Sequence, residues 1–259
     1  MCGIAGIVYN DRNRPVSVDD VRRMCGTLIH RGPDDEGFFV QGNVGLGMRR
    51  LKVIDLITGH QPISNEDGSI WIVFNGEIYN YPEIRRDLEQ KGHKFATHTD
   101  TETIVHAYEE YGDDCVAKLN GMFAFAIWDG RSEKLLLARD RIGVKPLYYY
   151  YDGHRLVFGS ELKAILQCHD IPRSVDSEAL DAFLTFEYIP APLSIFSGIK
   201  KLAAGHVFIL ELGEISTRQY WDLRFCRLKG DQKELGGALY ELLKDAVRTR
   251  LISDVPLGA

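Results

Sequence analysis

The chain of 259 residues predicts an α+β fold in which helices cover antiparallel sheets. Segments of strand length follow one another in hairpin order, and helix-length amphipathic segments separate the groups of strands. The sequence is 45% hydrophobic and 26% charged, as in ordinary globular proteins, and it is long enough for a substantial buried core. We therefore expect α+β layers built on antiparallel sheets.

The first half of the chain contains clearly periodic segments. Residues 18–30 carry apolar side chains at helical spacing after Ser17, which is a favourable helix start. Asn75-Gly76 between two apolar segments is the strongest short signal for a hairpin turn. In order, the predicted elements are a strand at 3–9, a helix at 18–30, a loop at 31–37, strands at about 37–41 and 44–48, strands at 70–74 and 77–79, and helices at 82–91 and 101–111.

The second half begins with four apolar segments in close succession, which predict a β-meander closed by a short helix. Residues 234–252 place leucines on one face of a helix, whereas residues 222–233 are polar and predict a linker. An apolar helix face needs a surface to pack against, so we expect the chain to end within the beginning of a second domain. The predicted elements are strands at 121–129, 134–140, 146–151 and 155–159, helices at 160–167 and 176–186, a hairpin at 206–211 and 215–220, and a helix at 234–252.

Charge and cysteine content argue against several classes of protein. The net charge is −6 and no run of Lys and Arg exceeds two residues, which argues against nucleic acid as a partner. The five cysteines are widely spaced and form no Cys-x-x-Cys pair, which predicts neither a disulfide framework nor a zinc site. The N-terminal apolar segment is too short and glycine-rich for a signal peptide, and the later segment 122–128 is far shorter than a membrane span. We expect a soluble, cytoplasmic protein without a membrane partner.

Cys2 is the strongest candidate for a catalytic residue. The small side chain after Met1 favours removal of Met1, and Cys2 would then carry both a thiol and a free α-amine. An α-amine titrates near pH ~7.7–8.0 and a cysteine thiol near ~8.5, so the amine could take the thiol proton at little cost. A nucleophile and its base would thus belong to one residue. The structural alternative is a small residue at the start of a buried strand.

Four polar clusters accompany Cys2, and each also has a structural interpretation. The Asn-Gly pair favours a turn, Thr99 or Asp100 can cap a helix, Arg50 can be solvated or form an ion pair, and the loop at 31–34 is explained by turn chemistry. The clusters are His30-Arg31-Gly32-Pro33-Asp34, Arg49-Arg50-Leu51 through Asp55, Asn75-Gly76-Glu77 and Thr99-Asp100-Thr101-Glu102.

The eight histidines show no metal-ligand spacing such as His-Glu-x-x-His, so we expect no metal site. We interpret His98 and His106 as surface or core residues. A pair between the Cys2 thiol and His30 or His60 stays open, because such partners meet in space rather than in sequence.

Short motifs from these clusters and beyond occur in a fixed order along residues 2–221. They are Cys2-Gly3-Ile4, His30-Arg31-Gly32-Pro33-Asp34, Arg50-Leu51 with Asp55, Asn75-Gly76-Glu77-Ile78-Tyr79-Asn80, Asp100-Thr101-Glu102, Gly121-Met122-Phe123-Ala124-Phe125-Ala126, Ala138-Arg139-Asp140-Arg141 with Gly143, and Lys145-Pro146-Leu147-Tyr148-Tyr149. Together they resemble the glutaminase domain of glutamine-hydrolysing asparagine synthetases, which are class II glutamine amidotransferases with an N-terminal nucleophile. One departure, Ala204 before Gly205 where relatives usually have proline, lies outside the expected site.

The resemblance implies an N-terminal-nucleophile hydrolase fold, a four-layer αββα sandwich of two antiparallel sheets covered by helices. It divides the chain into a glutaminase domain at 1–221, a linker at 222–233 and, at 234–259, the beginning of an ATP-using synthetase domain. In that family Ser253-Asp254-Val255-Pro256 precedes the pyrophosphate loop, so we expect this chain to end before that loop.

The resemblance also implies a role for each candidate site residue. Cys2 would attack the side-chain amide carbon of glutamine, and the Asn75 amide with the Gly76 N–H would hold the oxyanion. Arg50 would bind the α-carboxylate through its guanidinium fork. The remaining roles fall to Glu77 and Asp100, which would receive the α-ammonium, to Leu51, Val53 and Ile54, which would line the pocket, and to Arg31, which would organise the N-terminal strand.

Glutamine hydrolysis of this kind needs no cofactor, whereas the full-length synthetase reaction uses ATP and Mg²⁺ to convert aspartate to asparagine. The expected partners are L-glutamine, the synthetase domain and a second copy of the chain in a homodimer. Three alternatives stay open. They are the same glutaminase feeding another carboxylate in cell-surface or peptide modification, a non-catalytic module with a decayed site, and a papain-like Cys-His hydrolase.

Overall fold

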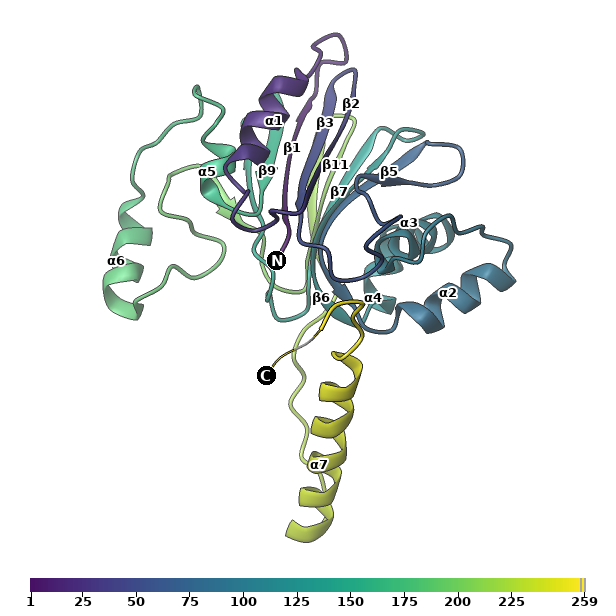
Figure 1. Cartoon of the computed structure of the whole chain (residues 1–259). Coiled ribbons are helices and arrows are strands. Elements are labelled where there is room, and N and C mark those ends of the chain that lie inside the picture. Colours follow the sequence, from purple (N-terminus) through teal and green to yellow (C-terminus); the bar gives the residue numbers. More distant parts are fainter. Residues whose placement is uncertain (257, 259) are drawn as a thin grey trace.

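Two antiparallel sheets lie face to face, and helices cover their outer faces (Figure 1). In the computed structural model, which describes residues 1–256 and 258, each sheet has six strands. The first sheet has the order β10 (Ile199–Lys201), β8 (Tyr148–Tyr151), β9 (Arg155–Gly159), β1 (Gly3–Tyr9), β3 (Val44–Arg50), β2 (Asp35–Gln41). The second has the order β12 (Glu214–Gln219), β11 (His206–Glu211), β7 (Lys134–Arg139), β6 (Gly121–Asp129), β5 (Ile70–Ile78), β4 (Ile63–Ser64).

The outer layers are helical. Two helices pack on the first sheet, α1 (Val18–Gly26) and α5 (Leu162–Ile165). Three helices pack on the second sheet: α2 (Tyr81–Gln90), α3 (Asp100–Tyr111) and α4 (Cys115–Lys118). The single turn η1 (Gly112–Asp114) lies between α3 and α4. Side-chain caps begin two of them: the Ser17 hydroxyl accepts from Asp19 N–H, and the Thr99 hydroxyl accepts from Glu102 N–H. The predicted α+β class and its αββα layering are confirmed.

Alternation along the central strands separates the layers of the core. In β6, Phe123 and Phe125 face the helices on the outer side, while Ala124, Ala126 and Trp128 face the other sheet. β1 divides its side chains in the same way between the inter-sheet core and the α1 side. Strands buried on both faces explain why these segments are apolar throughout rather than alternately polar.

A glycine on β3 lets α1 approach the first sheet closely. A Cβ at Gly47 would lie 2.5 Å from a Val21 methyl and 2.6 Å from the Cys25 sulfur, both on α1. The helix ends at Gly26 rather than at residue 30 as predicted, because Leu28 N–H closes a tighter turn on the Cys25 carbonyl at 2.8 Å.

The predicted hairpin turn at Asn75-Gly76 is wrong. β5 continues unbroken through both residues, which lie opposite Ala124 and Phe123 of β6. Nine consecutive residues of β5 pair with β6, and this long-range ladder outweighs a turn preference that rests on two residues.

The predicted meander is wrong after its second strand, because β7 belongs to the second sheet and β8 to the first. Polar side chains hold the crossing segment between them. The Asp140 carboxylate accepts from the N–H groups of Val144 and Lys145, each at 2.9 Å. The Arg139 guanidinium donates to three carbonyls, among them Leu202 at 2.6 Å.

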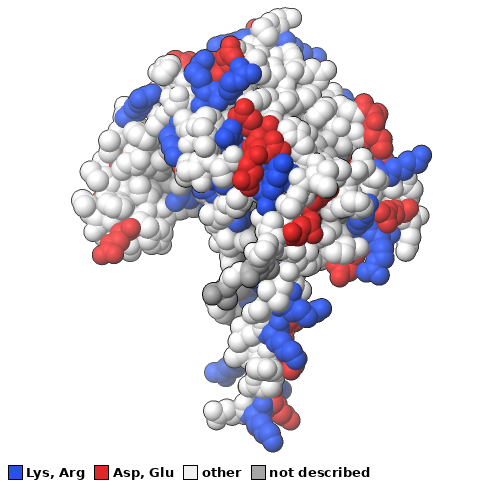
Figure 2. All heavy atoms as spheres, in the orientation of Figure 1, with Lys and Arg blue, Asp and Glu red and all other residues white. Residues whose placement is uncertain are grey.

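Two further helices, α6 (Ser177–Phe186) and α7 (Gln232–Thr249), project from the sandwich (Figure 1). Asp231 and Glu234 form a capping box at the start of α7. Residues 222–230, before it, contain no helix or strand. Figure 2 shows uncharged surface along α7 between its charged groups. The exposed apolar side chains of α7 include Leu239, Tyr240, Leu242, Leu243 and Val247.

Among the helices of residues 1–256, none combines the length and apolarity needed to cross a membrane.

Replacing Gly47 by Ala should destabilise the protein, because the added methyl overlaps α1 in a packed layer. We expect the free energy of unfolding, measured by urea titration, to fall by about 1–3 kcal/mol. Gly26→Ala is the matched control, since a Cβ there meets nothing within 4 Å. Equal stability of the two variants would contradict this account of the α1 packing.

Candidate active site

Cys2 lies directly before β1, between the two sheets at one end of the sandwich. Its sulfur accepts a hydrogen bond from Leu51 N–H at 3.4 Å, and the thiol lies 3.7 Å from the Leu51 carbonyl. The Arg31 guanidinium donates to the Cys2 carbonyl at 2.9 Å and pairs with Glu161 at 2.9 Å. Arg31 thus anchors the N-terminal strand, as predicted.

Two adjoining cavities open beside the Cys2 thiol. The larger has a volume of about 290 Å³ and the smaller about 20 Å³. All nine candidate residues for catalysis or glutamine binding line one or both of them. The larger is lined by Cys2, Leu51, Val53, Ile54, Asn75, Gly76 and Glu77, and the smaller by Arg50 and Asp100 with Cys2, Leu51, Val53, Ile54, Gly76 and Glu77.

Asn75 places an unsatisfied amide at the larger cavity. It belongs to β5, where alternation points its side chain with that of Val73 toward the other sheet. The side chain is fully buried, and neither its oxygen nor its nitrogen has a hydrogen-bond partner within residues 1–256 and 258. Because buried amides are normally paired, this one is available to a ligand.

The Gly76 N–H points to the edge of β5 that faces away from β6. N–H groups two residues apart in a strand share an edge, and those of Phe74 and Ile78 donate to the side chains of Gln61 at 2.8 Å and Asp100 at 2.9 Å. Gly76 N–H lies between them on this edge, which β4 leaves uncovered beyond Ile72. A backbone donor therefore lies beside the Asn75 amide.

The glycine at 76 is required by the neighbouring strand. A Cβ there would lie 2.2 Å from the Met122 carbonyl oxygen and 2.8 Å from the Phe123 Cα of β6. The missing side chain therefore makes room for β6.

Arg50 at the end of β3 supplies a buried cation. Its Nη2 donates to the carbonyls of Ile54 at 2.7 Å and Asp55 at 3.0 Å, which folds the following loop around the guanidinium. The Nη1 atom is buried and has no partner in the part of the chain that the structure describes. One edge of the guanidinium is thus fixed by backbone and the other is available to an anion.

Glu77 and Asp100 place two carboxyl groups at the smaller cavity. Burial raises the pKa of both groups, and the charge of Asp100 raises the pKa of Glu77 further. Hydrogen bonds from Ile78 N–H and the Thr101 backbone act in the opposite direction on the pKa of Asp100. A bound cation would stabilise the ionised form of both groups.

Burial also controls the thiol and the amine. It raises the pKa of the Cys2 thiol, although the Leu51 N–H opposes this rise. It lowers the pKa of the Met1 amine, and the charges of Lys145 and Arg31 lower it further. These directions mean that the thiol holds its proton more tightly than an exposed thiol and needs a base, whereas the Met1 amine holds its proton less tightly than an exposed amine.

The segment after α7 reaches back to the larger cavity. The Arg250 guanidinium lies 4.7 Å from the centre of the Tyr79 ring, and both residues line the cavity. Asp254 forms two hydrogen bonds with the loop after β3: its N–H donates to the Val53 carbonyl at 2.9 Å, and its carboxylate accepts from Asp55 N–H at 2.7 Å. We call this pair of bonds the Asp254 contact.

Several residues that line the larger cavity were not among the predicted site residues. The most notable is Lys145, which is only 3% exposed and belongs to a motif that was noted without a role. Burial lowers the pKa of Lys145, while the charges of Glu77 and Cys2 raise it. His30 pairs with Glu161 at 2.9 Å and His60 with Asp35 at 3.0 Å, and neither histidine lines a cavity with Cys2.

Comparison with known proteins gives three kinds of similarity. A family described as a glutamine amidotransferase domain matches residues 1–221. Asparagine synthetase [glutamine-hydrolyzing] 1 of Bacillus subtilis (strain 168) is 38% identical over 264 residues, covering 100% of this chain and 41% of that protein. Putative asparagine synthetase [glutamine-hydrolyzing] 2 of Methanocaldococcus jannaschii is 39% identical over 282 residues, covering 100% of this chain and 54% of that protein. The chain thus spans about half, or less, of the length of these relatives.

The fold has solved counterparts as well. Glutamine phosphoribosylpyrophosphate amidotransferase from B. subtilis aligns with a TM-score of 0.59 at 20% sequence identity, over 85% of this chain and 49% of that one. At this identity the likeness concerns the fold alone, which is the same sandwich of antiparallel sheets and helices. The family match is of a different kind, since it covers most of the chain, including every strand of both sheets. The chain therefore belongs to the family of glutamine amidotransferase domains.

Proposed function

We propose that the protein hydrolyses L-glutamine to glutamate and ammonia with Cys2, freed of Met1, as the nucleophile, and that the ammonia serves a synthetase domain that makes asparagine from aspartate. The observation that carries the first part is the buried Asn75 amide in the cavity beside the Cys2 thiol, which has no hydrogen-bond partner among the residues that the structure describes. Leaving a buried polar group unpaired costs about 1–3 kcal/mol, a cost that a ligand with a matching oxygen would offset.

In the proposed reaction the Cys2 sulfur bonds to the side-chain amide carbon of glutamine while its proton passes to the Cys2 α-amine. The oxyanion that forms accepts hydrogen bonds from the Asn75 amide and the Gly76 N–H. The carbon–nitrogen bond then breaks, and the amine returns the proton to the departing ammonia. Water attacks the resulting thioester, which releases glutamate and restores the thiol.

The charged groups of the site support glutamine as the substrate. The free edge of the Arg50 guanidinium suits the α-carboxylate, and the two carboxyl groups of Glu77 and Asp100 suit the α-ammonium. Leu51, Val53 and Ile54 would then form the wall along the aliphatic part of the substrate. Nothing in this scheme requires a metal or cofactor.

A synthetase domain as the acceptor of ammonia is supported by the relatives and by α7. Both relatives are named glutamine-hydrolysing asparagine synthetases and are about twice as long as this chain or longer. α7 exposes a row of leucines, with Leu242 70% exposed, which a further domain could cover. In this proposal ATP and Mg²⁺ belong to that domain, and we assign no residue of this chain to them. The names of the two relatives favour aspartate over another carboxylate as the acceptor of the ammonia.

Cys2→Ala should abolish the release of ammonia from glutamine, because no other group at the cavity can form the thioester. Protein that retains Met1 should be equally inactive, because the Cys2 nitrogen then belongs to a peptide bond and cannot act as a base. The measurement is ammonia release by preparations whose N-terminus is defined by mass spectrometry. Cys168→Ser is the control, as this cysteine lies against the outer layer of the first sheet and should leave the rate unchanged. Substantial activity of Cys2→Ala would rule the nucleophile out.

Asn75→Ala and Arg50→Ala should separate two kinds of defect. Loss of the Asn75 donor should lower kcat by about 10²–10³-fold, because the donor acts on charge that develops in the transition state. Loss of Arg50 should mainly raise KM for glutamine through lost ground-state binding. Arg49→Ala controls for the arginine change, since Arg49 pairs with Glu36 and lines neither cavity. A normal kcat for Asn75→Ala, or a normal KM for Arg50→Ala, contradicts the assigned role.

Asp254 should act as a positioning residue for the loop that carries Leu51. Asp254→Ala removes an acceptor for Asp55 N–H and should raise KM for glutamine with a smaller change in kcat. Asp254→Asn keeps an oxygen acceptor and should restore much of the affinity. Asp245→Ala is the control, because Asp245 is exposed on α7 and its carboxylate pairs with Arg248 of the same helix. An unchanged KM for Asp254→Ala would show that the loop holds its shape without this contact.

A further inference from the structure

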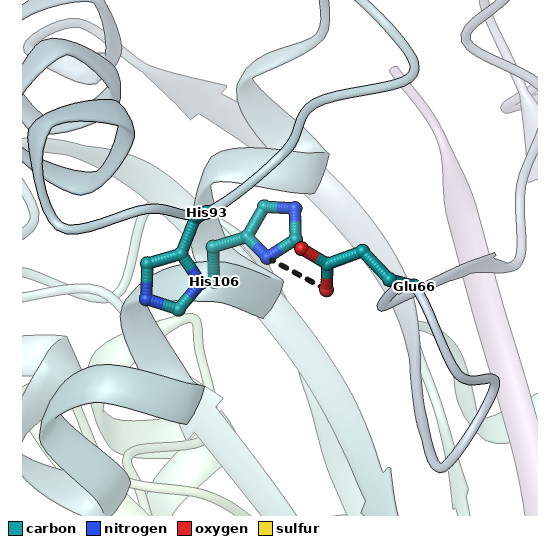
Figure 3. A group of neighbouring side chains, drawn as sticks. All are labelled: Glu66, His93 and His106. Atoms are coloured by element: carbon teal, nitrogen blue, oxygen red, sulfur yellow. Dashed lines mark ion pairs between the residues drawn. The ribbon is translucent and has the colours of Figure 1, made fainter.

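A second cluster of polar side chains lies on the helix-covered face of the second sheet, apart from the glutamine site (Figure 3). Glu66 comes from the turn between β4 and β5, His93 follows α2, and His106 lies on α3. One donor atom from each of the three lies within 4.8 Å of the other two. Three separate segments therefore converge on one point, which explains why no spacing motif revealed it.

Both histidines turn the same ring nitrogen inward. His106 Nδ1 lies 2.8 Å from Glu109 Oε2 and 3.8 Å from Glu66 Oε2. His93 Nδ1 lies 3.6 Å from the same Glu109 Oε2. Four ligands at about 2.0–2.2 Å around a tetrahedral zinc ion lie roughly 3.3 Å from one another. Three of the separations between these four atoms, 2.8, 3.6 and 3.8 Å, are close to that value.

The outward atoms of these residues are held by a second set of contacts. His93 Nε2 faces Glu110 at 3.5 Å, and His106 Nε2 faces Glu102 at 3.7 Å. Glu66 Oε1 accepts from Lys94 N–H at 3.1 Å, and Glu109 Oε1 accepts from the Asn65 amide at 2.8 Å. A carboxylate behind each histidine and one anchored oxygen on each carboxylate are typical of the surroundings of metal ligands.

His106 also has an unsatisfied atom. Its side chain is 1% exposed, and its Nε2 has no hydrogen-bond partner among the described residues, although Glu102 is near. The Glu102 carboxylate is already occupied by the N–H groups of Ala96 and Thr97 and by the Thr97 hydroxyl. A metal on Nδ1 would place the ring proton on Nε2, which then faces a carboxylate.

We propose that Glu66, His93, His106 and Glu109 bind one zinc ion. Two imidazoles and two carboxylates form a neutral site with the cation, and four protein ligands make it a closed, structural site rather than a catalytic one. The ion would tie the β4–β5 turn, the loop after α2 and the middle of α3 together. This inference does not rest on the proposed glutaminase reaction.

The test is a zinc titration of chelator-treated protein, followed by calorimetry and by the melting temperature. Cobalt(II) serves as a second probe, because its absorption spectrum distinguishes tetrahedral nitrogen and oxygen ligands from thiolates. Each measurement is repeated in a Cys2→Ala, Cys226→Ala background to remove binding by accessible thiols. The ligand variants are Glu66→Gln and His93→Ala, and Glu102→Gln tests the outer contact. Glu83→Gln, an exposed acid on α2 outside the cluster, and His98→Ala are the matched controls.

We expect one zinc ion per chain, a rise in melting temperature on binding, and a cobalt spectrum without thiolate bands. Glu66→Gln and His93→Ala should bind zinc at least about tenfold more weakly and lose the thermal stabilisation, and Glu102→Gln should weaken binding about 10–100-fold. The controls should behave as the parent. Glu66 is half-exposed, so its variant should fold even if a histidine variant does not. Failure of the parent to bind zinc, or equal affinity in Glu66→Gln, would overturn the proposal and leave the cluster as a network of histidine–carboxylate contacts.

Discussion

The position of the proposed nucleophile depends on one interaction, the antiparallel pairing of β1 with β3. In this register Gly3 lies opposite Arg49, so Cys2 comes to the end of β3 and its sulfur meets Leu51 N–H. A shift of the pairing by one residue would exchange the two faces of β1. Side chains that now pack between the sheets would then face α1, and those that face α1 would point between the sheets. Burial of β1 on both faces therefore determines the register, and the register determines the position of the Cys2 thiol.

The site keeps buried polar groups at one end of a sandwich whose other buried side chains are mostly apolar. Among the residues that the structure describes, the Asn75 amide and one Arg50 nitrogen lack hydrogen-bond partners. Burial raises the pKa of Glu77 and Asp100. Each such group lowers the stability of the folded chain by a kcal/mol or more on the usual scale. In the proposed reaction glutamine offers a matching group for each, so the features that cost stability are also those that would specify the ligand.

Periodicity and capping residues were sufficient to predict most of the elements, because the signals are local. Ser17 and Thr99 begin the helices that they cap, and the apolar segment at the start of the chain forms β1. The prediction of a turn at Asn75-Gly76 was wrong because the pairing of β5 with β6 is a long-range interaction that the local sequence does not reveal. The prediction of a continuous meander after β7 was wrong for a similar reason. Side chains such as Asp140 hold the segment that crosses between the sheets, and they do so only once both sheets have formed.

The candidate site residues came from the order of motifs and not from physics alone, and the structure gathers them at two adjoining cavities. What could not be predicted are contacts between distant segments. Lys145 reaches the cavity from the crossing segment. The Asp254 contact joins Asp55 to a residue 199 positions later in the sequence, and the cluster at His106 unites a turn, a loop and a helix. The local sequence pattern carries no information on such long-range contacts.

The central claim is that the thiol of an N-terminal Cys2 forms a covalent intermediate with glutamine. The direct measurement is acid quenching during turnover of isotopically labelled glutamine, followed by mass spectrometry of the proteolysed chain. The account predicts a glutamyl thioester on the N-terminal peptide, only on molecules that begin with Cys2 and not on those that retain Met1. A label on any other residue, or on the peptide that still carries Met1, would contradict it.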